Sequence, residues 1–224
     1  MRADPDVWRR EANKTDGTPY YELLLVYVDD ILAVVHQLDE TIKAIGAVYK
    51  IKEGSDGPPT TYLGAQVYKH NLPDGRSAWG MSSEKYVKNA VRTVQDLLEK
   101  DDRPKHHLKT TANVPFPTSY KPELDFSREL SEGMLSRYRQ LIGILRWSVE
   151  IGCLDIYLET AVLSQYRSVT ERRTSRAVYH VFAFLKTHPK MKIVFDPKGV
   201  ELDESGFHTI NAKEWYEIYG DVVE

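Results

Sequence analysis

Short apolar runs bounded by turn-forming residues dominate the first eighty residues of the chain. Apolar and aromatic side chains are concentrated in 20–28 and 31–35, and a shorter run begins at Val7, before the polar segment 13–17. Aliphatic and β-branched runs bounded by Gly, Asn and Asp are typical of strands. The pattern therefore predicts a hairpin that leads directly into a second hairpin.

The pattern changes between residues 39 and 81. Apolar residues at helical spacing predict a helix over 39–48, and a Gly/Pro-rich loop follows at 54–59. A strand is predicted over 61–68 and another over 77–81, and the turn-rich segment 71–75 joins them as a further hairpin.

Helical periodicity is the main pattern from Ser82 onwards. Ser82 and Ser83 are suited to capping a helix whose apolar stripe is Val87, Ala90, Val91, Val94 and Leu98. A polar, proline-bearing segment, 101–122, reads as a linker, with a domain boundary near residue 110. Beyond it the pattern predicts helices over 136–165, with possible breaks at Gly143 and Gly152, and over 173–188, then a lone strand over 191–195.

Composition and charge narrow the class of protein. The chain has 224 residues, 42% of them hydrophobic, which is enough for real cores. Residues 81–200 carry 20 basic against 14 acidic side chains, whereas residues 201–224 carry 1 against 7. A basic middle segment suits a polyanion-binding surface, although a solvated face would give the same pattern. The lone cysteine, Cys153, lies in an apolar context and reads as a small buried hydrophobe.

The absence of an apolar stretch long enough for a membrane span predicts a soluble, intracellular protein without a membrane partner. The pattern does not distinguish a cytoplasmic particle from the nucleus. His106, His107, His180 and His188 have no cysteine or tight carboxylate cluster beside them, so we interpret them as structural or surface residues.

The segment with the clearest chemical potential is Tyr27-Val28-Asp29-Asp30, between two apolar runs. Adjacent carboxylates at a hairpin tip suit Mg²⁺, which prefers carboxylate oxygens and takes further ligands from water and phosphates. The alternative is an ordinary polar turn.

Four segments occur in an order that resembles the order of motifs in the reverse transcriptase of copia-type LTR retrotransposons. Each segment is weak alone, but together they cover nearly the whole chain, with a further likeness in the late helix 176–188. The segments are 25–32 around Asp29-Asp30, Tyr62-Leu63-Gly64, Met81-Ser82-Ser83-Glu84-Lys85-Tyr86-Val87, and 138–147.

The resemblance implies an RNA-directed DNA polymerase that uses two Mg²⁺ (or Mn²⁺) ions. Asp29 would be a metal ligand and Asp30 its partner, with Tyr27 and Val28 beside the primer terminus. RNA template, DNA primer and deoxynucleotides would be the substrates.

Two further segments receive roles from the resemblance. Tyr62, Leu63 and Gly64 would form the primer grip, with a strand that merely contains a bulge glycine as the alternative. Lys85, Lys88 and Arg92 would contact the duplex backbone from a thumb helix, with a solvated helix face as the alternative. Tyr138, Arg139, Arg146 and Trp147 are expected to pack with partial exposure and receive no chemical role.

The implied fold class is α+β: part of a polymerase palm made of antiparallel hairpins plus a helix, then a mainly helical thumb and connection. The palm would span 1–80, the thumb-like basic helix 81–110, the helical thumb and connection 111–200, and an acidic tail 201–224. That tail, with Trp215-Tyr216 and Tyr219-Gly220-Asp221, would lead toward a ribonuclease H domain that is not in this sequence.

The chain departs from the family in lacking an earlier carboxylate strand and the fingers. Only Asp4, Asp6 and Asp16 precede the hairpin, and Asp6-Val7-Trp8 instead suits a strand that pairs with 20–28. We therefore expect a polymerase fragment that is inactive without upstream palm and fingers. A non-catalytic protein that binds RNA–DNA hybrids, or an unstable relic, are the alternatives.

Overall fold

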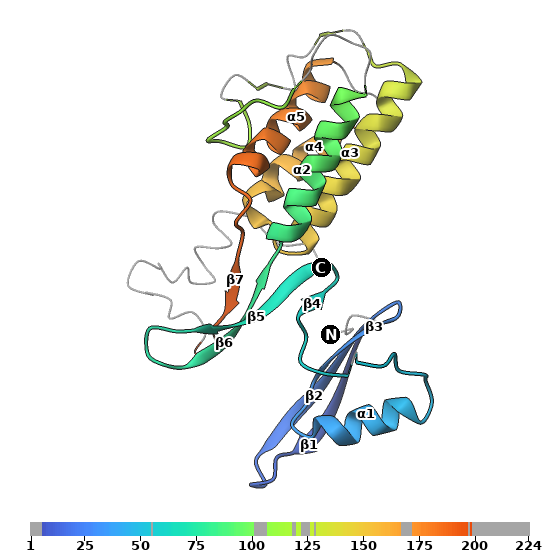
Figure 1. Ribbon diagram of the computed structural model, residues 1–224, viewed down its shortest axis with the longest axis vertical. Helices are drawn as coiled ribbons and strands as arrows, with labels where there is room; N and C mark the ends of the chain where they lie inside the picture. The colour runs from blue at the N-terminus through green and yellow to red at the C-terminus, as the bar shows by residue number, and fades with distance from the viewer. Residues whose placement is uncertain are drawn as a thin grey trace, which may run out of the picture.

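The computed structural model describes residues 6–54, 56–100, 107–117, 120–121, 126–127, 129–166, 172–196 and 198. It is a mixed α and β structure, as the sequence pattern predicted, with two antiparallel sheets and a group of packed helices (Figure 1). Asp4, His106 and the acidic tail 201–224, with its Trp215-Tyr216 and Tyr219–Asp221 motifs, lie outside the described residues.

The first sheet is a three-stranded meander with strand order β1-β2-β3. Its strands are β1 (Val7–Asn13), β2 (Pro19–Tyr27) and β3 (Asp30–Val34), and helix α1 (Leu38–Gly46) follows them. In the register, Arg10 pairs with Glu22 and Leu25 with Leu32. The prediction that the segment beginning at Asp6-Val7 pairs with the strand of the aspartate hairpin is confirmed.

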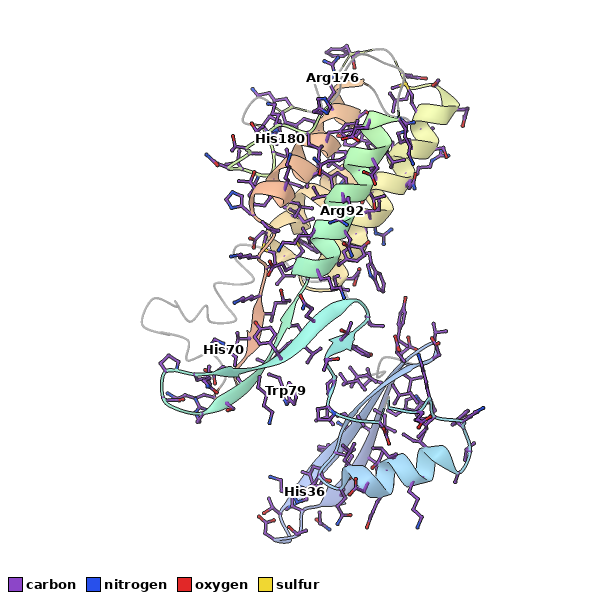
Figure 2. The ribbon with its side chains drawn as sticks, viewed as in Figure 1. His36, His70, Trp79, Arg92, Arg176 and His180 are labelled. Atoms are coloured by element: carbon purple, nitrogen blue, oxygen red, sulfur yellow. The ribbon has the colours of Figure 1, made fainter. Side chains whose placement is uncertain are left out.

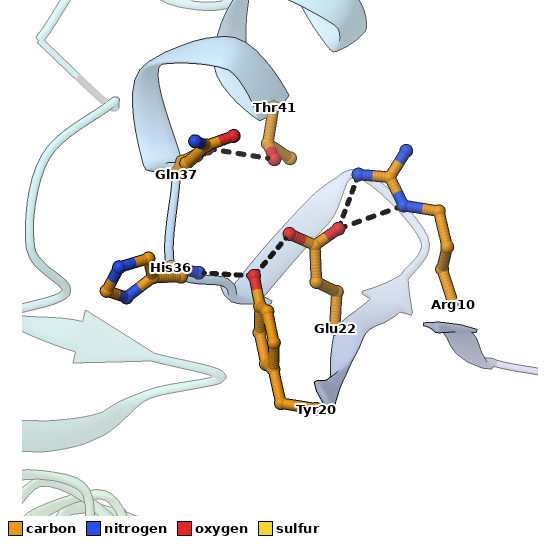
Figure 3. A network of polar contacts seen from close by, with 6 residues as sticks. All are labelled: Arg10, Tyr20, Glu22, His36, Gln37 and Thr41. Atoms are coloured by element: carbon orange, nitrogen blue, oxygen red, sulfur yellow. Dashed lines mark hydrogen bonds and ion pairs between the residues drawn. The ribbon is translucent and has the colours of Figure 1, made fainter. Parts of the chain in front are cut away.

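A polar network, drawn in Figure 3, ties the far end of this sheet together. Glu22 is 7% exposed and accepts hydrogen bonds from Tyr20 Oη at 2.7 Å and from Arg10 Nε at 2.9 Å. The Tyr20 hydroxyl in turn accepts one from the His36 amide at 3.1 Å. These bonds fix the chain where it leaves β3 for α1.

The first sheet and α1 bury little apolar surface. Among the described residues before Ala65, Glu22 is the only buried side chain, and α1 buries none of its own. Trp8 is 65% exposed, and Tyr21 and Val34 are also exposed. Because burial of apolar side chains is the main stabilising term in folding, this part of the chain holds together chiefly through its strand pairing and the Glu22 network.

The second sheet has four strands in the order β4-β5-β6-β7. They are β4 (Thr61–Tyr62), β5 (Ala65–Asn71), β6 (Ser77–Ser82) and β7 (Ile193–Phe195). The expected single strand over 61–68 is wrong, because the chain reverses at Leu63-Gly64 and β4 pairs back on β5. The late strand predicted over 191–195 pairs with β6, which places the start of β7 near the start of α2 (Figure 1).

The helices supply the hydrophobic core. They are α2 (Glu84–Glu99), α3 (Glu132–Glu150), the short 3₁₀ helix η2 (Leu154–Ile156), α4 (Tyr157–Ser164) and α5 (Arg172–Thr187). Val94 of α2, Tyr138 and Leu145 of α3, and Phe182 of α5 are all buried in one cluster. A fully buried side chain of this kind contributes roughly 1.5–3 kcal/mol to folding.

The expected linker packs against this core. Leu108 and Ala112 are buried, and the Ala112 amide donates to Thr187 Oγ1 at 3.1 Å. The core therefore continues across the boundary expected near residue 110. Of the two possible breaks, Gly152 follows the end of α3, whereas Gly143 lies inside that helix.

Candidate functional site

The tip of the β2–β3 hairpin is formed by the acidic tetrapeptide. Tyr27 pairs with Asp30, so Val28 and Asp29 are the two residues of the turn. Val28 has φ +57° and is 87% exposed, and Asp29 and Asp30 are exposed beside it. A β-branched residue at positive φ costs on the order of 1–3 kcal/mol, and such strain is concentrated at functional sites.

The second tip lies between β4 and β5. Tyr62 pairs with Ala65, which leaves Leu63 and Gly64 in the turn at φ +51° and +90°. A turn with two positive φ values matches the twist of the strands that it joins. A Cβ at Gly64 would make only an ordinary 3.9 Å contact with Tyr86, so glycine is needed here for backbone conformation rather than for space.

An electrostatic effect links the two tips. Burial raises the pKa of Tyr62 above its ordinary value, and the negative charge of Asp30 raises it further. Tyr62, in the predicted primer grip, is therefore within electrostatic range of Asp30.

A third segment reaches the same place from the helical part of the chain. The ring of Tyr27 lies 6.0 Å from the ring of Trp147, centroid to centroid, with the planes inclined at 44°. Trp147 is half-buried on α3, next to the fully buried Ser148. The partial exposure expected of Trp147 is confirmed, but the same expectation is wrong for Tyr138, which is fully buried in the helical core, and for Arg139 and Arg146, which are exposed. The contact of Trp147 with the hairpin could not be read from helical spacing.

The donor set at the tip fits part of a metal site. Asp29 and Asp30 offer exposed carboxylates, and Mg²⁺ is commonly bound through one or two carboxylates with waters and substrate phosphates. Within the described ranges, no group of three or more His, Cys, Asp or Glu side chains is arranged to hold a metal ion. Among the described residues, Asp29 and Asp30 therefore have no further acidic, His or Cys side chain grouped with them.

The predicted basic face of α2 is present on the surface. Lys85, Lys88 and Arg92 are all exposed, and Figure 2 labels Arg92 midway along the helix. Lys88 Nζ lies 2.5 Å from Glu84 Oε1, and this ion pair offsets part of the positive charge. A set of lysines near the same helix end, Lys190 and Lys192, was not assigned from sequence. Their signal was the alternation Lys190-Met191-Lys192, with one buried residue between two exposed ones.

The other candidate residues have structural surroundings. Cys153 is fully buried, as predicted, and burial raises its pKa to about 12, with a smaller contribution from the carboxylate of Asp155. His180 makes a 3.0 Å hydrogen bond to the Val114 carbonyl, and His188 stacks on Phe184 with 4.8 Å between ring centroids. These contacts with protein groups explain the positions of the two histidines, and no bound ligand is needed to explain them.

Comparison with family models, with curated proteins and with solved structures found no match to this chain. In the part of the chain that the structure describes, no helix has both the length and the apolar character needed to cross a membrane. Any assignment of function therefore depends on the sequence motifs and on the geometry around Asp30.

Proposed function

We propose that this chain is part of a copia-type reverse transcriptase and carries the aspartate hairpin of the palm together with thumb and connection. The observation that supports this most is the contact between the aspartate turn and the helical part of the chain. The ring of Tyr27, beside the Asp29-Asp30 turn, lies 6.0 Å from the ring of Trp147 on α3, a segment far away in sequence. The charge of Asp30 also acts on Tyr62 of the second turn.

Backbone strain at both tips supports the same proposal. Val28 and Leu63 are the only described non-glycine residues with positive φ, and each lies in one of the two turns. Neither valine nor leucine is favoured at such a position, so a local preference does not explain their presence. Strained residues at both tips fit a site that must hold a primer end in a fixed position.

The proposed chemistry is transfer of a nucleotide to a primer 3′-hydroxyl. In the assembled polymerase, Asp29 and Asp30 would hold Mg²⁺, which lowers the pKa of the hydroxyl and stabilises charge on the leaving pyrophosphate. The tip of Tyr62–Gly64 would support the primer strand. The third carboxylate would come from a segment other than those described, so we expect no polymerisation by this chain alone.

The weakly covered first sheet is compatible with that requirement. Trp8, Tyr21 and Val34 are large apolar residues that remain exposed on the same sheet as the aspartate turn. Apolar side chains gain stability when another layer covers them. An upstream palm segment that supplies the missing carboxylate would provide such a layer.

A binding protein without catalysis is the second candidate. It is favoured by the incomplete donor set at Asp29 and Asp30 and by the exposed cations of α2. In that case the chain would hold an RNA–DNA hybrid through its phosphates, and the aspartate turn would have no chemical role.

Manganese binding distinguishes the two candidates without requiring activity. Paramagnetic Mn²⁺ added to the ¹⁵N-labelled chain should broaden the amide signals of both tips, 27–31 and 62–64. The double variant Asp29→Asn/Asp30→Asn should abolish the broadening. The matched control is Asp39→Asn/Glu40→Gln, which removes another adjacent acidic pair, exposed in the first turn of α1. Absence of broadening at both tips would overturn the polymerase proposal and leave the binding protein.

Primer extension tests the second part of the proposal. With an RNA template, a DNA primer, deoxynucleotides and Mg²⁺, the chain alone should give no extension. Robust extension that disappears in Asp29→Ala would show that the described carboxylates suffice, and it would overturn the requirement for a third one from elsewhere.

A further inference from the structure

A segment late in the chain is fixed against the first turn of α2 and presents two lysines there. Met191 is buried, and its carbonyl accepts a 2.8 Å hydrogen bond from Ser82 Oγ, two residues before α2 begins. Lys190 and Lys192, on either side of Met191, are exposed. Pairing of Met81 with Ile193 continues the attachment into β7, so Lys192 lies between two attached residues and Lys190 lies next to one.

Lysines of α2 extend the same surface. Lys85 and Lys88 are exposed in the first two turns of the helix, next to the Ser82–Met191 attachment. Glu84 lies among the lysines, and its pKa is held below its ordinary value, chiefly by the hydrogen bond from Lys88 and in smaller part by Lys190 and Lys192. One carboxylate therefore faces three of the four ammonium groups.

We propose that Lys85, Lys88, Lys190 and Lys192, the lysine cluster, bind the phosphate backbone of a nucleic-acid duplex. The proposal rests on the proposed function, because it names further contacts to the same class of partner. It adds residues from the segment between α5 and β7 to a surface that sequence alone placed only on α2. Glu84 has the opposite effect, since it neutralises part of the cluster.

A nucleic-acid duplex fits the lysine cluster because the lysines are carried on well-ordered backbone segments. Two of the lysines stand on a helix, and the other two flank an anchored residue next to a paired strand, so the backbone positions that carry them are fixed. Phosphates repeat regularly along a duplex, and ammonium groups release counterions from them on binding. Arg92, one helical turn beyond Lys88, continues the positive row.

Charge removal provides the first test. Binding of the full chain to a fluorescent 20-base-pair DNA duplex is measured by anisotropy over a series of salt concentrations. Lys190→Gln/Lys192→Gln should lower affinity about tenfold or more at 0.1 M salt and reduce the slope of log K against log salt by about 1.8. The control, Lys14→Gln/Lys109→Gln, removes the same charge from exposed positions elsewhere and should change neither quantity.

Glu84→Gln provides the opposite test, because it removes the carboxylate that pairs with Lys88. Affinity for the duplex should rise several-fold, with a steeper salt slope. The control is Glu132→Gln, since Glu132 occupies the first turn of α3 as Glu84 does in α2. Thermal melting followed by circular dichroism verifies that each variant is folded.

The outcomes separate this proposal from the proposed function. Equal affinity of Lys190→Gln/Lys192→Gln and its control would overturn the lysine cluster, whatever the manganese experiment shows. If Lys190→Gln/Lys192→Gln loses duplex binding while Mn²⁺ has no effect at Asp29, the lysine-cluster proposal stands and the polymerase proposal is overturned. Lysine-dependent binding to phosphatidylserine vesicles without binding to duplex would also overturn the proposal, since it identifies an anionic membrane as the partner.

Discussion

The ring of Tyr27 packs against the indole of Trp147, with 6.0 Å between their centroids. Tyr27 ends β2 at the aspartate turn, whereas Trp147 belongs to α3 in the helical core. The contact therefore connects a part of the chain that buries little apolar surface to a part that is well packed. It is the relationship through which the helices can position Asp29 and Asp30.

The two rings should be energetically coupled. A double-mutant cycle with Tyr27→Leu, Trp147→Leu and the double variant should give a coupling of about 0.5–1.5 kcal/mol, the usual range for an aromatic pair. Urea unfolding of the four proteins measures it. Free energies that add to within about 0.3 kcal/mol would mean that the rings do not interact in solution.

Substitution of two glycines by alanine should have opposite effects. A Cβ at Gly80 would lie 2.7 Å from Cζ of Tyr68, whereas none of the atoms considered lies within 4 Å of a Cβ at Gly143. Gly80→Ala should destabilise the protein by about 1–2 kcal/mol through overpacking. Gly143→Ala should stabilise it by about 0.5–1 kcal/mol, because alanine is a better helix former.

Tyr68 is the control for the glycine pair. In a Tyr68→Val background, the cost of Gly80→Ala should fall, since the clashing ring is absent, and the gain from Gly143→Ala should persist. Differential scanning calorimetry of these variants compares the two effects. An unchanged cost at Gly80 would attribute it to the backbone rather than to Tyr68.

The pH dependence of the first sheet should depend on Glu22. Hydrogen bonds from Tyr20 and Arg10 hold the pKa of Glu22 below its ordinary value. A carboxyl whose pKa is lower in the folded state stabilises the fold above its unfolded pKa, and this contribution is lost as pH falls through the folded value. The contribution should therefore be present at pH 7 and decline below about pH 4.5.

The Glu22→Gln variant tests this linkage. It should be less stable than the parent at pH 7 and should lose less stability between pH 7 and pH 3, as measured by urea unfolding followed by near-ultraviolet absorbance. Glu11→Gln is the control, because Glu11 is exposed on β1 and pairs with Tyr21 rather than with the network. Parallel pH profiles for the parent and Glu22→Gln would contradict the assignment.

Local signals in the sequence were sufficient for most elements. The apolar runs around the aspartate turn and the stripe from Val87 to Leu98 predicted β2, β3 and α2, because periodicity reflects which face is buried. The reversal at Leu63-Gly64 was missed because Leu63 gives no turn signal, and its positive φ depends on the surrounding structure.

Long-range relationships were beyond sequence pattern. The shared core of α2, α3 and α5 depends on packing between segments separated by a linker with no periodicity of its own. The effect of the Asp30 charge on the pKa of Tyr62, and the contact of Tyr27 with Trp147, likewise depend on how whole elements pack. The order of motifs predicted that these segments belong together, but their contacts required coordinates.

The thiol of Cys153 should be inert in the native protein. It is fully buried, and burial raises its pKa to about 12, so the reactive thiolate is scarce at pH 8. Because it is the only cysteine in the chain, its reaction with Ellman's reagent is read without interference. The native protein should react at least roughly a hundredfold more slowly than the protein in 6 M guanidinium chloride. Comparable rates would mean that the packing of Cys153 beneath α3 opens readily, and the core that positions Trp147 would then be less rigid than its burial indicates.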